Sequence, residues 1–274
     1  MTSKKNGWLS APYLVWITGF VVLPLCTIIY YAFSSKTGGF TFDNILGAIT
    51  SDTNLKALGL SVLFSVLTTA ICFVLAYPLA LCLSKLKLKR KSFLVFLFIL
   101  PMWMNFMLQM VAIRVILEDN GILNMLLTSL GFPALSIANS PAAILVGMVY
   151  DYFPFMLLPI YNAVSRIDNS LINASKDLGA NTFITFTRVI FPLSLPGIVS
   201  GITMVFVPTI SDFAIADMLG GSKILLIGNV IESNFTRGQY YQGSGLAVLL
   251  MIFVIVTSLF AGGGKDDEGS VLMP

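Results

Sequence analysis

The chain has 274 residues, of which 57% are hydrophobic and only 11% are charged, with a net charge of +3. Because a soluble domain carries roughly 25% charged residues, this composition excludes an ordinary water-facing surface and predicts an integral membrane protein. It also excludes a disordered chain, and the three cysteines are too few for a secreted disulfide scaffold.

Six apolar stretches are long enough, or nearly long enough, to cross the hydrocarbon core of a membrane, which takes about 20 helical residues. In chain order they cover residues 9–33, 58–83, 93–117, 142–164, 192–210 and 246–261. The first is too long for the apolar part of a signal peptide and no small-residue cleavage pattern follows it, so it is expected to be retained. The sequence therefore predicts an all-α integral membrane protein with six transmembrane helices.

The same spans divide the chain into three predicted regions. Residues 1–54 hold an N-terminal cytoplasmic end, the first transmembrane helix and an outer loop. Residues 55–261 form a core of five transmembrane helices, and residues 262–274 form a cytoplasmic tail. Prolines lie within or near several of the apolar runs, and each frees a backbone carbonyl. In lipid such breaks survive where neighbouring helices or a water-filled path satisfy the backbone, which favours a bundle with a cavity.

Basic residues set the expected orientation of the spans. The short segment 85–91, between the second and third spans, carries five positive charges. Most of the other lysines and arginines, among them Lys4, Lys5 and Arg188, fall on the same side as this segment. The positive-inside rule places this side, and with it both termini, in the cytoplasm. We interpret segment 85–91 as a topology anchor and expect no nucleic-acid partner.

The segment between the fourth and fifth spans is the most informative part of the sequence. Asp168 or Asn169 can cap a short helix, and Gly179 is placed to end that helix in a left-handed conformation. Asn181 can cap a second short helix, which Pro192 is expected to end or redirect into the membrane. Apolar residues recur on one face of the first helix at Leu171, Ala174 and Leu178. The predicted product is a cytoplasmic helix–turn–helix whose apolar face docks into another protein.

This segment resembles the loop E-A-A-x(3)-G-x(9)-I-x-L-P in the membrane subunits of ATP-binding-cassette importers. The residues that match at the family spacing are Ala174, Gly179 and Pro192. The residues that depart from it are Asn173 for the glutamate, Ser175 for the second alanine, Val189 for the isoleucine and Phe191 for the leucine. The resemblance implies the fold of a type I importer permease with a cytoplasmic coupling helix. It assigns the contact with the ATPase to Asn173, Ala174, Ser175, Asp177, Leu178, Gly179, Ala180 and Pro192.

Two further stretches, 151–159 and 217–231, look like the corresponding parts of spermidine/putrescine importer permeases, and specifically of the first of their two permease subunits. This resemblance implies a bacterial cell-membrane protein that forms the translocation pathway for polyamines. The implied partners are a second permease in a heterodimer, a cytoplasmic ATPase dimer, an extracytoplasmic binding protein and membrane lipid. The chain contains no G-x-x-x-x-G-K-[ST] phosphate loop, so ATP and Mg²⁺ are expected on the ATPase and no cofactor on this chain.

A polyamine is a flexible chain of ammonium groups, so its passage needs carboxylates for charge and aromatic faces for cation–π contact. The candidates for this passage are Tyr150, Asp151, Tyr152, Trp103, Asp212 and Asp217. A carboxylate on a spanning helix is costly and by default faces a cavity. Asp151 could instead form a structural pair, with Arg114 as one partner, and Trp103 could pack against apolar neighbours. The acidic outer side could equally serve as a docking surface for the binding protein.

Other functions stay open on the sequence alone. The same architecture serves other solutes, such as ferric iron, thiamine or a phosphonate. A stand-alone channel or secondary transporter would be expected to show internal inverted repeats, which we do not see in the sequence. An enzyme is disfavoured, because the chain has no histidine and no nucleophile–base or metal constellation. We therefore expect no catalytic residues and no metal ligands in this chain.

Overall fold

The computed structural model describes residues 11–86, 91–221 and 224–262. Predictions for Lys4, Lys5, residues 87–90 and the tail from 263 onward lie outside these ranges. Within them, the chain is almost entirely helical, and the only extended pairing is an isolated bridge between Ser34 and Phe40. The chain divides into two compact units: one is Met1–Ala57 with Val230–Ile255, and the other is Leu58–Asn229 with Val256–Pro274.

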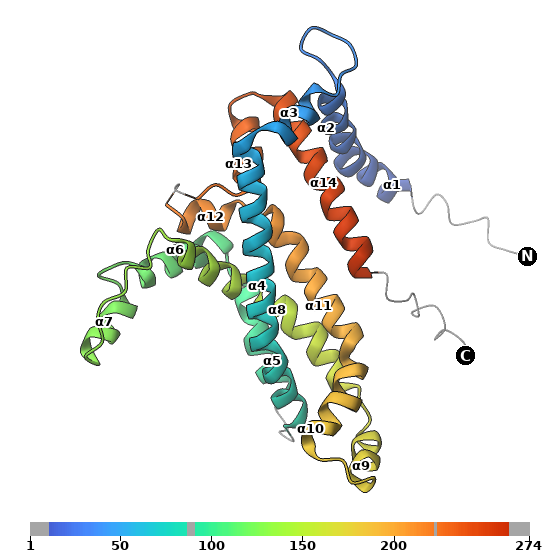
Figure 1. Ribbon diagram of the computed structural model, residues 1–274, viewed down its shortest axis with the longest axis vertical. Coiled ribbons are helices and arrows are strands. Elements are labelled where there is room, and N and C mark those ends of the chain that lie inside the picture. The colour runs from blue at the N-terminus through green and yellow to red at the C-terminus, as the bar shows by residue number, and fades with distance from the viewer. Residues whose placement is uncertain (1–10, 87–90, 222–223, 263–274) are drawn as a thin grey trace, which may run out of the picture. The chain divides into compact units, whose positions relative to one another are not determined.

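Figure 1 shows the helices in order along the chain. Their bounds are α1 (Ala11–Ile17), η1 (Thr18–Val22), α2 (Leu23–Phe33), α3 (Asp43–Thr50), α4 (Asp52–Lys85), α5 (Lys91–Ile99), η2 (Leu100–Trp103), α6 (Phe106–Leu117), α7 (Ile122–Ser129), α8 (Pro141–Ser165), α9 (Asn169–Asp177), α10 (Thr182–Thr185), η3 (Phe186–Ile190), α11 (Phe191–Ser211), α12 (Ala214–Leu219), α13 (Ile227–Thr236) and α14 (Tyr240–Gly262).

Among the described residues, five helical segments are long and apolar enough to cross a membrane, and a sixth candidate is a bent pair, which is either a broken span or a re-entrant loop. The five straight candidates are Pro12–Phe33, Asp52–Lys85, Pro141–Ser165, Thr182–Ser211 and Tyr240–Leu259. The bent pair is Phe93–Trp103 with Phe106–Ser129. Five of the six apolar stretches seen in the sequence therefore fall on single helical segments of membrane-spanning length and composition, the third falls on the bent pair, and the all-α fold is confirmed.

The third span differs from a simple continuous helix, because its two halves meet at an angle of 96°. A 3₁₀ turn that contains Pro101 ends the first half, and Asn105 caps α6 by accepting a hydrogen bond from the Leu108 amide at 3.2 Å. The carbonyl of Pro101 accepts a hydrogen bond from the amide of Met104 at 3.0 Å, and the side-chain amide of Gln109 donates to the same oxygen. An internal side chain thus adds a second hydrogen bond where the helix is interrupted.

Of the two outcomes expected at Pro192, the one in which it ends a short helix is wrong. The helix runs without a stop from Thr182 to Ser211, through a π-helical turn at η3. The Phe191 amide closes this wide turn on the carbonyl of Phe186, one residue before the proline. A π turn gives the proline ring room where an α turn would clash with the carbonyl four residues earlier. The first span has the same arrangement, since the π-helical turn η1 ends two residues before Pro24.

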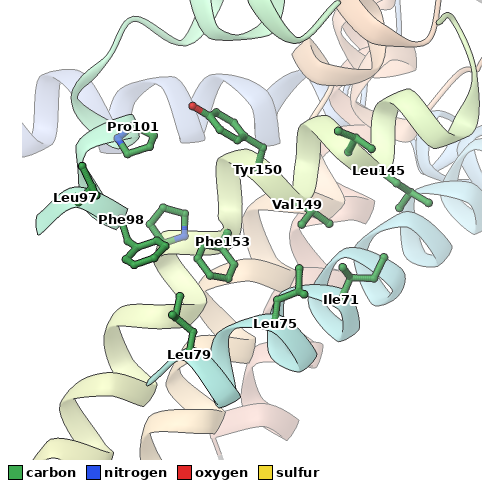
Figure 2. A pocket seen from close by; sticks show the side chains of 12 residues that line it. Ile71, Leu75, Leu79, Leu97, Phe98, Pro101, Leu145, Val149, Tyr150 and Phe153 are labelled. Atoms are coloured by element: carbon green, nitrogen blue, oxygen red, sulfur yellow. The ribbon is translucent and has the colours of Figure 1, made fainter. Parts of the chain in front are cut away.

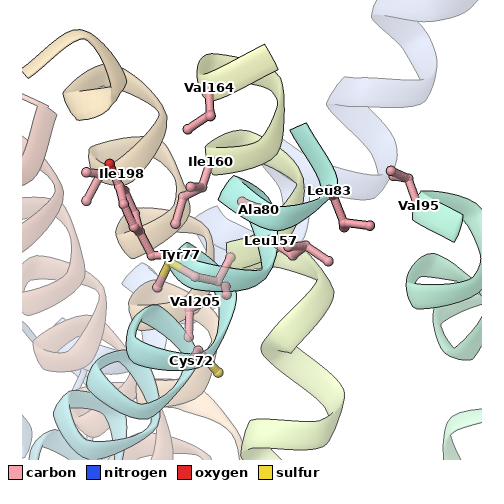
Figure 3. Close-up of a cluster of buried hydrophobic side chains, with 12 residues drawn as sticks. Cys72, Tyr77, Ala80, Leu83, Val95, Leu157, Ile160, Val164, Ile198 and Val205 are labelled. Carbon is pink, nitrogen blue, oxygen red and sulfur yellow. The ribbon is translucent and has the colours of Figure 1, made fainter. Parts of the chain in front are cut away.

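One hydrophobic cluster of the second unit lies among α4, α5, α8 and α11 (Figure 3), and another includes residues of α4, α6, α8 and α12. Helices α8 and α11 approach closely because Gly197 and Gly201 carry no side chain. A Cβ atom on Gly197 would lie 2.6 Å from the carbonyl oxygen of Pro159. Tyr77 on α4 completes the link, since its buried hydroxyl and that of Ser194 on α11 are hydrogen-bonded at 2.8 Å. These contacts join three spans near the connection from α8 to α11.

Candidate coupling loop and substrate passage

The connection from α8 to α11 forms the two helical arms and the turn that the sequence predicts. Asp168 caps α9, because its Oδ1 accepts a hydrogen bond from the Ser170 amide at 2.9 Å. This bond stabilises the ionised carboxylate and lowers the pKa of Asp168. Gly179 then adopts a φ of +82°, and Asn181 caps α10 by accepting from the Ile184 amide at 2.8 Å. Both predicted caps and the left-handed glycine are confirmed.

The turn between the arms is a Schellman motif. The amide of Ala180 donates to the carbonyl of Ser175 at 3.1 Å, and the amide of Gly179 donates to that of Lys176 at 2.9 Å. The arms are also joined through their side chains, since the hydroxyls of Ser175 and Thr185 are 2.9 Å apart. Ser175 occupies the position of the second alanine in the importer loop, so this departure adds a polar link between the arms. The hydrogen bond between Ser175 and Thr185 was not predicted from the sequence.

The surface of the loop carries apolar side chains that nothing in the described chain covers. Leu178 is 89% exposed, Phe183 is 72% exposed and Leu171 is 48% exposed. A shallow hollow of about 500 Å³ lies among the arms, and its lining residues are Leu171, Ala174, Ser175, Leu178, Gly179, Ala180, Ile184, Arg188 and Val189. The structure thus gathers most of the residues predicted to contact the ATPase. Asn173 and Asp177 are exposed on α9, and Pro192 lies apart from the hollow at the start of α11.

The structure brings three of the predicted passage residues together. The hydroxyl of Tyr152 on α8 donates to Oδ2 of Asp212 at 2.8 Å. Oδ1 of Asp212 accepts from the amide of Ile215 at 3.1 Å, which fixes the carboxylate at the end of α11. Asp151 precedes Tyr152 on α8, and like Asp212 it is half-buried. We call Asp151, Tyr152 and Asp212 the acidic cluster.

The remaining passage candidates lie elsewhere. Asp217 is exposed on α12, and Trp103 is 80% exposed, with its ring edge-on to Phe96 at 6.2 Å. The suggested pair between Asp151 and Arg114 is not formed: Arg114 is exposed on α6, whereas Asp151 is half-buried on α8. No cation pairs with Asp151 among the described residues.

Tyr150 faces a different environment from its neighbours in the acidic cluster. It lines a cavity of about 750 Å³ among α4, α5, η2 and α8 (Figure 2). The other lining residues are Ile71, Leu75, Leu79, Leu97, Phe98, Pro101, Leu145, Val146, Val149, Phe153 and Pro154. Because the tyrosine hydroxyl is the one polar side-chain group in this lining, the cavity offers an ammonium group no counter-charge. Of the two predicted tyrosines, Tyr150 thus lines an apolar cavity and Tyr152 belongs to the acidic cluster.

Comparisons with known proteins agree with this architecture. Residues 73–263 match the family described as "Binding-protein-dependent transport system inner membrane component". The spermidine/putrescine transport system permease protein PotB of Haemophilus influenzae is 37% identical over 254 residues, which cover 88% of each chain. PotB of Escherichia coli K12 is 36% identical over 249 residues, 86% of this chain and 89% of that one.

A solved structure supports the same fold. A chain of a bacterial ABC transporter involved in the import of the acidic polysaccharide alginate superposes with a TM-score of 0.74 over 95% of both chains. Its sequence is only 19% identical, so this likeness concerns the fold alone. The match of the family profile extends over more than half of the chain, from α4 to the end of α14. The chain therefore belongs to the family of binding-protein-dependent transport system inner membrane components.

Proposed function

We propose that this chain is one permease subunit of an ATP-driven importer that carries polyamines, with spermidine and putrescine as substrates. The observation that carries the proposal is the identity of 36–37% to two spermidine/putrescine permeases over nearly the full length of all three chains. The acidic cluster supports it from the chemistry of the site, because a half-buried pair of carboxylates suits a substrate that carries several ammonium groups.

The proposed complex contains a second permease, a cytoplasmic ATPase dimer and an extracytoplasmic binding protein. The name of the family implies the binding protein. The sequence has no phosphate loop of the G-x-x-x-x-G-K-[ST] type, so ATP and Mg²⁺ bind to the ATPase. The loop at Gly179, with its exposed Leu178 and Phe183, is the surface on which the ATPase docks. Movement of the ATPase then reaches the spans through η3 and α11, which continue the loop without a break.

At the acidic cluster, the chain contributes charge and orientation. Asp151 and Asp212 are both half-buried carboxylates, and an ammonium group bound between them gains charge attraction from each. The hydroxyl of Tyr152 holds one oxygen of Asp212, which leaves Asp151 as the freer carboxylate. A succession of ammonium groups spaced by methylenes can be passed along such a pair without any group entering the apolar cavity beside Tyr150.

The substrate class is tested by uptake into liposomes that contain the full complex with its binding protein and internal ATP. Labelled spermidine and putrescine are expected to accumulate in an ATP-dependent manner, and excess unlabelled polyamine should abolish the signal. Ferric iron, thiamine and a phosphonate are offered to the same preparation. ATP-driven uptake of one of these in place of polyamines would assign the importer to another solute. Uptake without the ATPase would instead indicate a channel or secondary transporter.

The proposed orientation, with both termini in the cytoplasm, predicts the result of a reporter fusion. A reporter that is active only in the cytoplasm should be active when it is fused after Lys91, because five positive charges in 85–91 hold that segment inside. The same reporter should be silent when it is fused at Gly221, beyond the end of the fifth span. The measurement is reporter activity normalised to the amount of fusion protein. The reverse pattern would place the coupling loop on the wrong side for an ATPase.

A further inference from the structure

An exposed apolar strip follows the end of the first span. Phe40 is 72% exposed and Phe42 is 55% exposed, while Leu46 and Ile49 on α3 are 56% and 46% exposed. Phe42, Leu46 and Ile49 are separated by four and three residues, so they share one face of the helix that starts after Phe42. We call Phe40, Phe42, Leu46 and Ile49 the apolar strip.

A tight hairpin returns the chain to the end of α2. Gly38 and Gly39 adopt φ values of +83° and +117°, which form the turn, and the amide of Thr41 donates to the carbonyl of Phe33 at 2.9 Å. Phe40 and Phe42 flank Thr41, so both rings come back to the level of Phe33, the last residue of α2. The strip therefore begins where the apolar helix ends.

Ring contacts and one amide side chain fix this arrangement. Phe40 stacks on Phe33 with ring centroids 5.6 Å apart and meets Phe42 edge-on at 5.0 Å. The amide nitrogen of Asn44 donates to three carbonyls at the end of α2, those of Tyr31, Ala32 and Ser34. The first turn of α3 is thus tied to the helix, while the apolar face of α3 stays uncovered.

The length of the span gives the depth of the strip. Pro12–Phe33 has 22 residues. At 1.5 Å per residue it is about 33 Å long, close to the ~30 Å thickness of the hydrocarbon core. Most of its side chains are exposed, and burial is confined to its last turn, where Ala32 is buried and Phe33 is half-buried next to the strip. A helix of this length that spans the membrane ends at the boundary between acyl chains and headgroups.

We infer that the apolar strip lies in the headgroup–acyl boundary of the bilayer and anchors the end of the first span there. Its partner is the lipid surface. The strip is short, amphipathic and continuous with an apolar spanning helix, and its aromatic rings sit where interfacial segments place theirs. Lys36 at the hairpin tip extends beyond the strip toward phosphate and water. The anchor sets the depth of the first span, because a shift along the membrane normal would pull the strip into water or drive Lys36 into hydrocarbon.

Photo-crosslinking identifies what covers the strip. The photoreactive analogue p-benzoyl-phenylalanine is introduced in place of Phe40 or Leu46, and in place of Thr37 at the exposed hairpin tip as the matched control. The complete transporter, in phosphatidylcholine–phosphatidylglycerol nanodiscs with its binding protein present, is irradiated and analysed by mass spectrometry. We expect phospholipid adducts at positions 40 and 46, several times more abundant than at position 37. Adducts with the binding protein or the second permease, or no lipid adduct at either position, would overturn the inference.

Discussion

Replacement of Gly179 with valine is expected to reduce import strongly while the protein still inserts into the membrane. Gly179 has a φ of +82°, and a Cβ atom added to it meets no neighbour within 4 Å. The cost of a side chain there is therefore conformational rather than steric, about 1–2 kcal/mol for a left-handed residue and more for a β-branched one. If the loop must regain its turn to dock, the ATPase should bind about five- to thirtyfold more weakly.

A matched variant separates the backbone effect from the loss of glycine as such. Asparagine tolerates the left-handed conformation, so Gly179→Asn should retain most of the uptake that Gly179→Val loses. Membrane level, ATPase co-purification and polyamine uptake are measured on the same preparations. Normal uptake by fully expressed Gly179→Val would show that this loop does not couple ATP hydrolysis to transport. Equal loss in both variants would indicate that the glycine surface, and not its φ, contacts the ATPase.

The sequence predicted the elements whose signals are local. Apolar length gave the positions of the spans, and short-range capping residues gave the coupling loop. Asp168, Gly179 and Asn181 each act on backbone groups within three residues of their own position, so the pattern of residue types was sufficient. The docking partner of the loop has no such local signal and came from the family resemblance.

The break at Pro101 and the π turn before Pro192 were not predicted, because they depend on how the backbone accommodates each proline. Pro101 and Pro192 look alike in the sequence, since both interrupt an apolar run. At Pro101 the helix ends and turns by 96°, where Asn105 starts a new helix. At Pro192 a π turn absorbs the ring and the helix continues. Gln109 accompanies the first case, because its side-chain amide donates to the Pro101 carbonyl at the break.

The acidic cluster was only partly accessible from the sequence. Tyr152 and Asp212 are 60 positions apart, and only the packing of α8 on α11 brings them into hydrogen-bonding contact. The sequence named Asp151, Asp212 and Asp217 as equals, whereas the fold buries part of the first two and leaves the third on the surface of α12. The residue types identified the three candidate carboxylates, and their burial in the fold distinguishes Asp151 and Asp212 from the exposed Asp217.

Neutralising either carboxylate of the acidic cluster should impair transport and leave the protein as stable as before, or more stable. In Asp212→Asn the amide oxygen can still accept from Ile215, and the amide nitrogen can donate to the Tyr152 hydroxyl, so the change removes charge and keeps both contacts. Loss of a charged hydrogen bond to an ammonium group costs about 1.5–3 kcal/mol, so polyamine uptake should fall by tenfold or more. Asp151→Asn should act in the same direction.

Thermal stability distinguishes this role from a structural one. Because both carboxylates are half-buried and no cation pairs with them among the described residues, Asn at either position should keep or raise the melting temperature, as expected where function retains a costly buried charge. Asp119→Asn, an exposed carboxylate outside the cluster, is the control and should change neither property. Asp212→Glu restores the charge and should recover part of the uptake. Unchanged uptake in both Asn variants, or a drop in melting temperature that accounts for the loss, would remove the acidic cluster from the substrate passage.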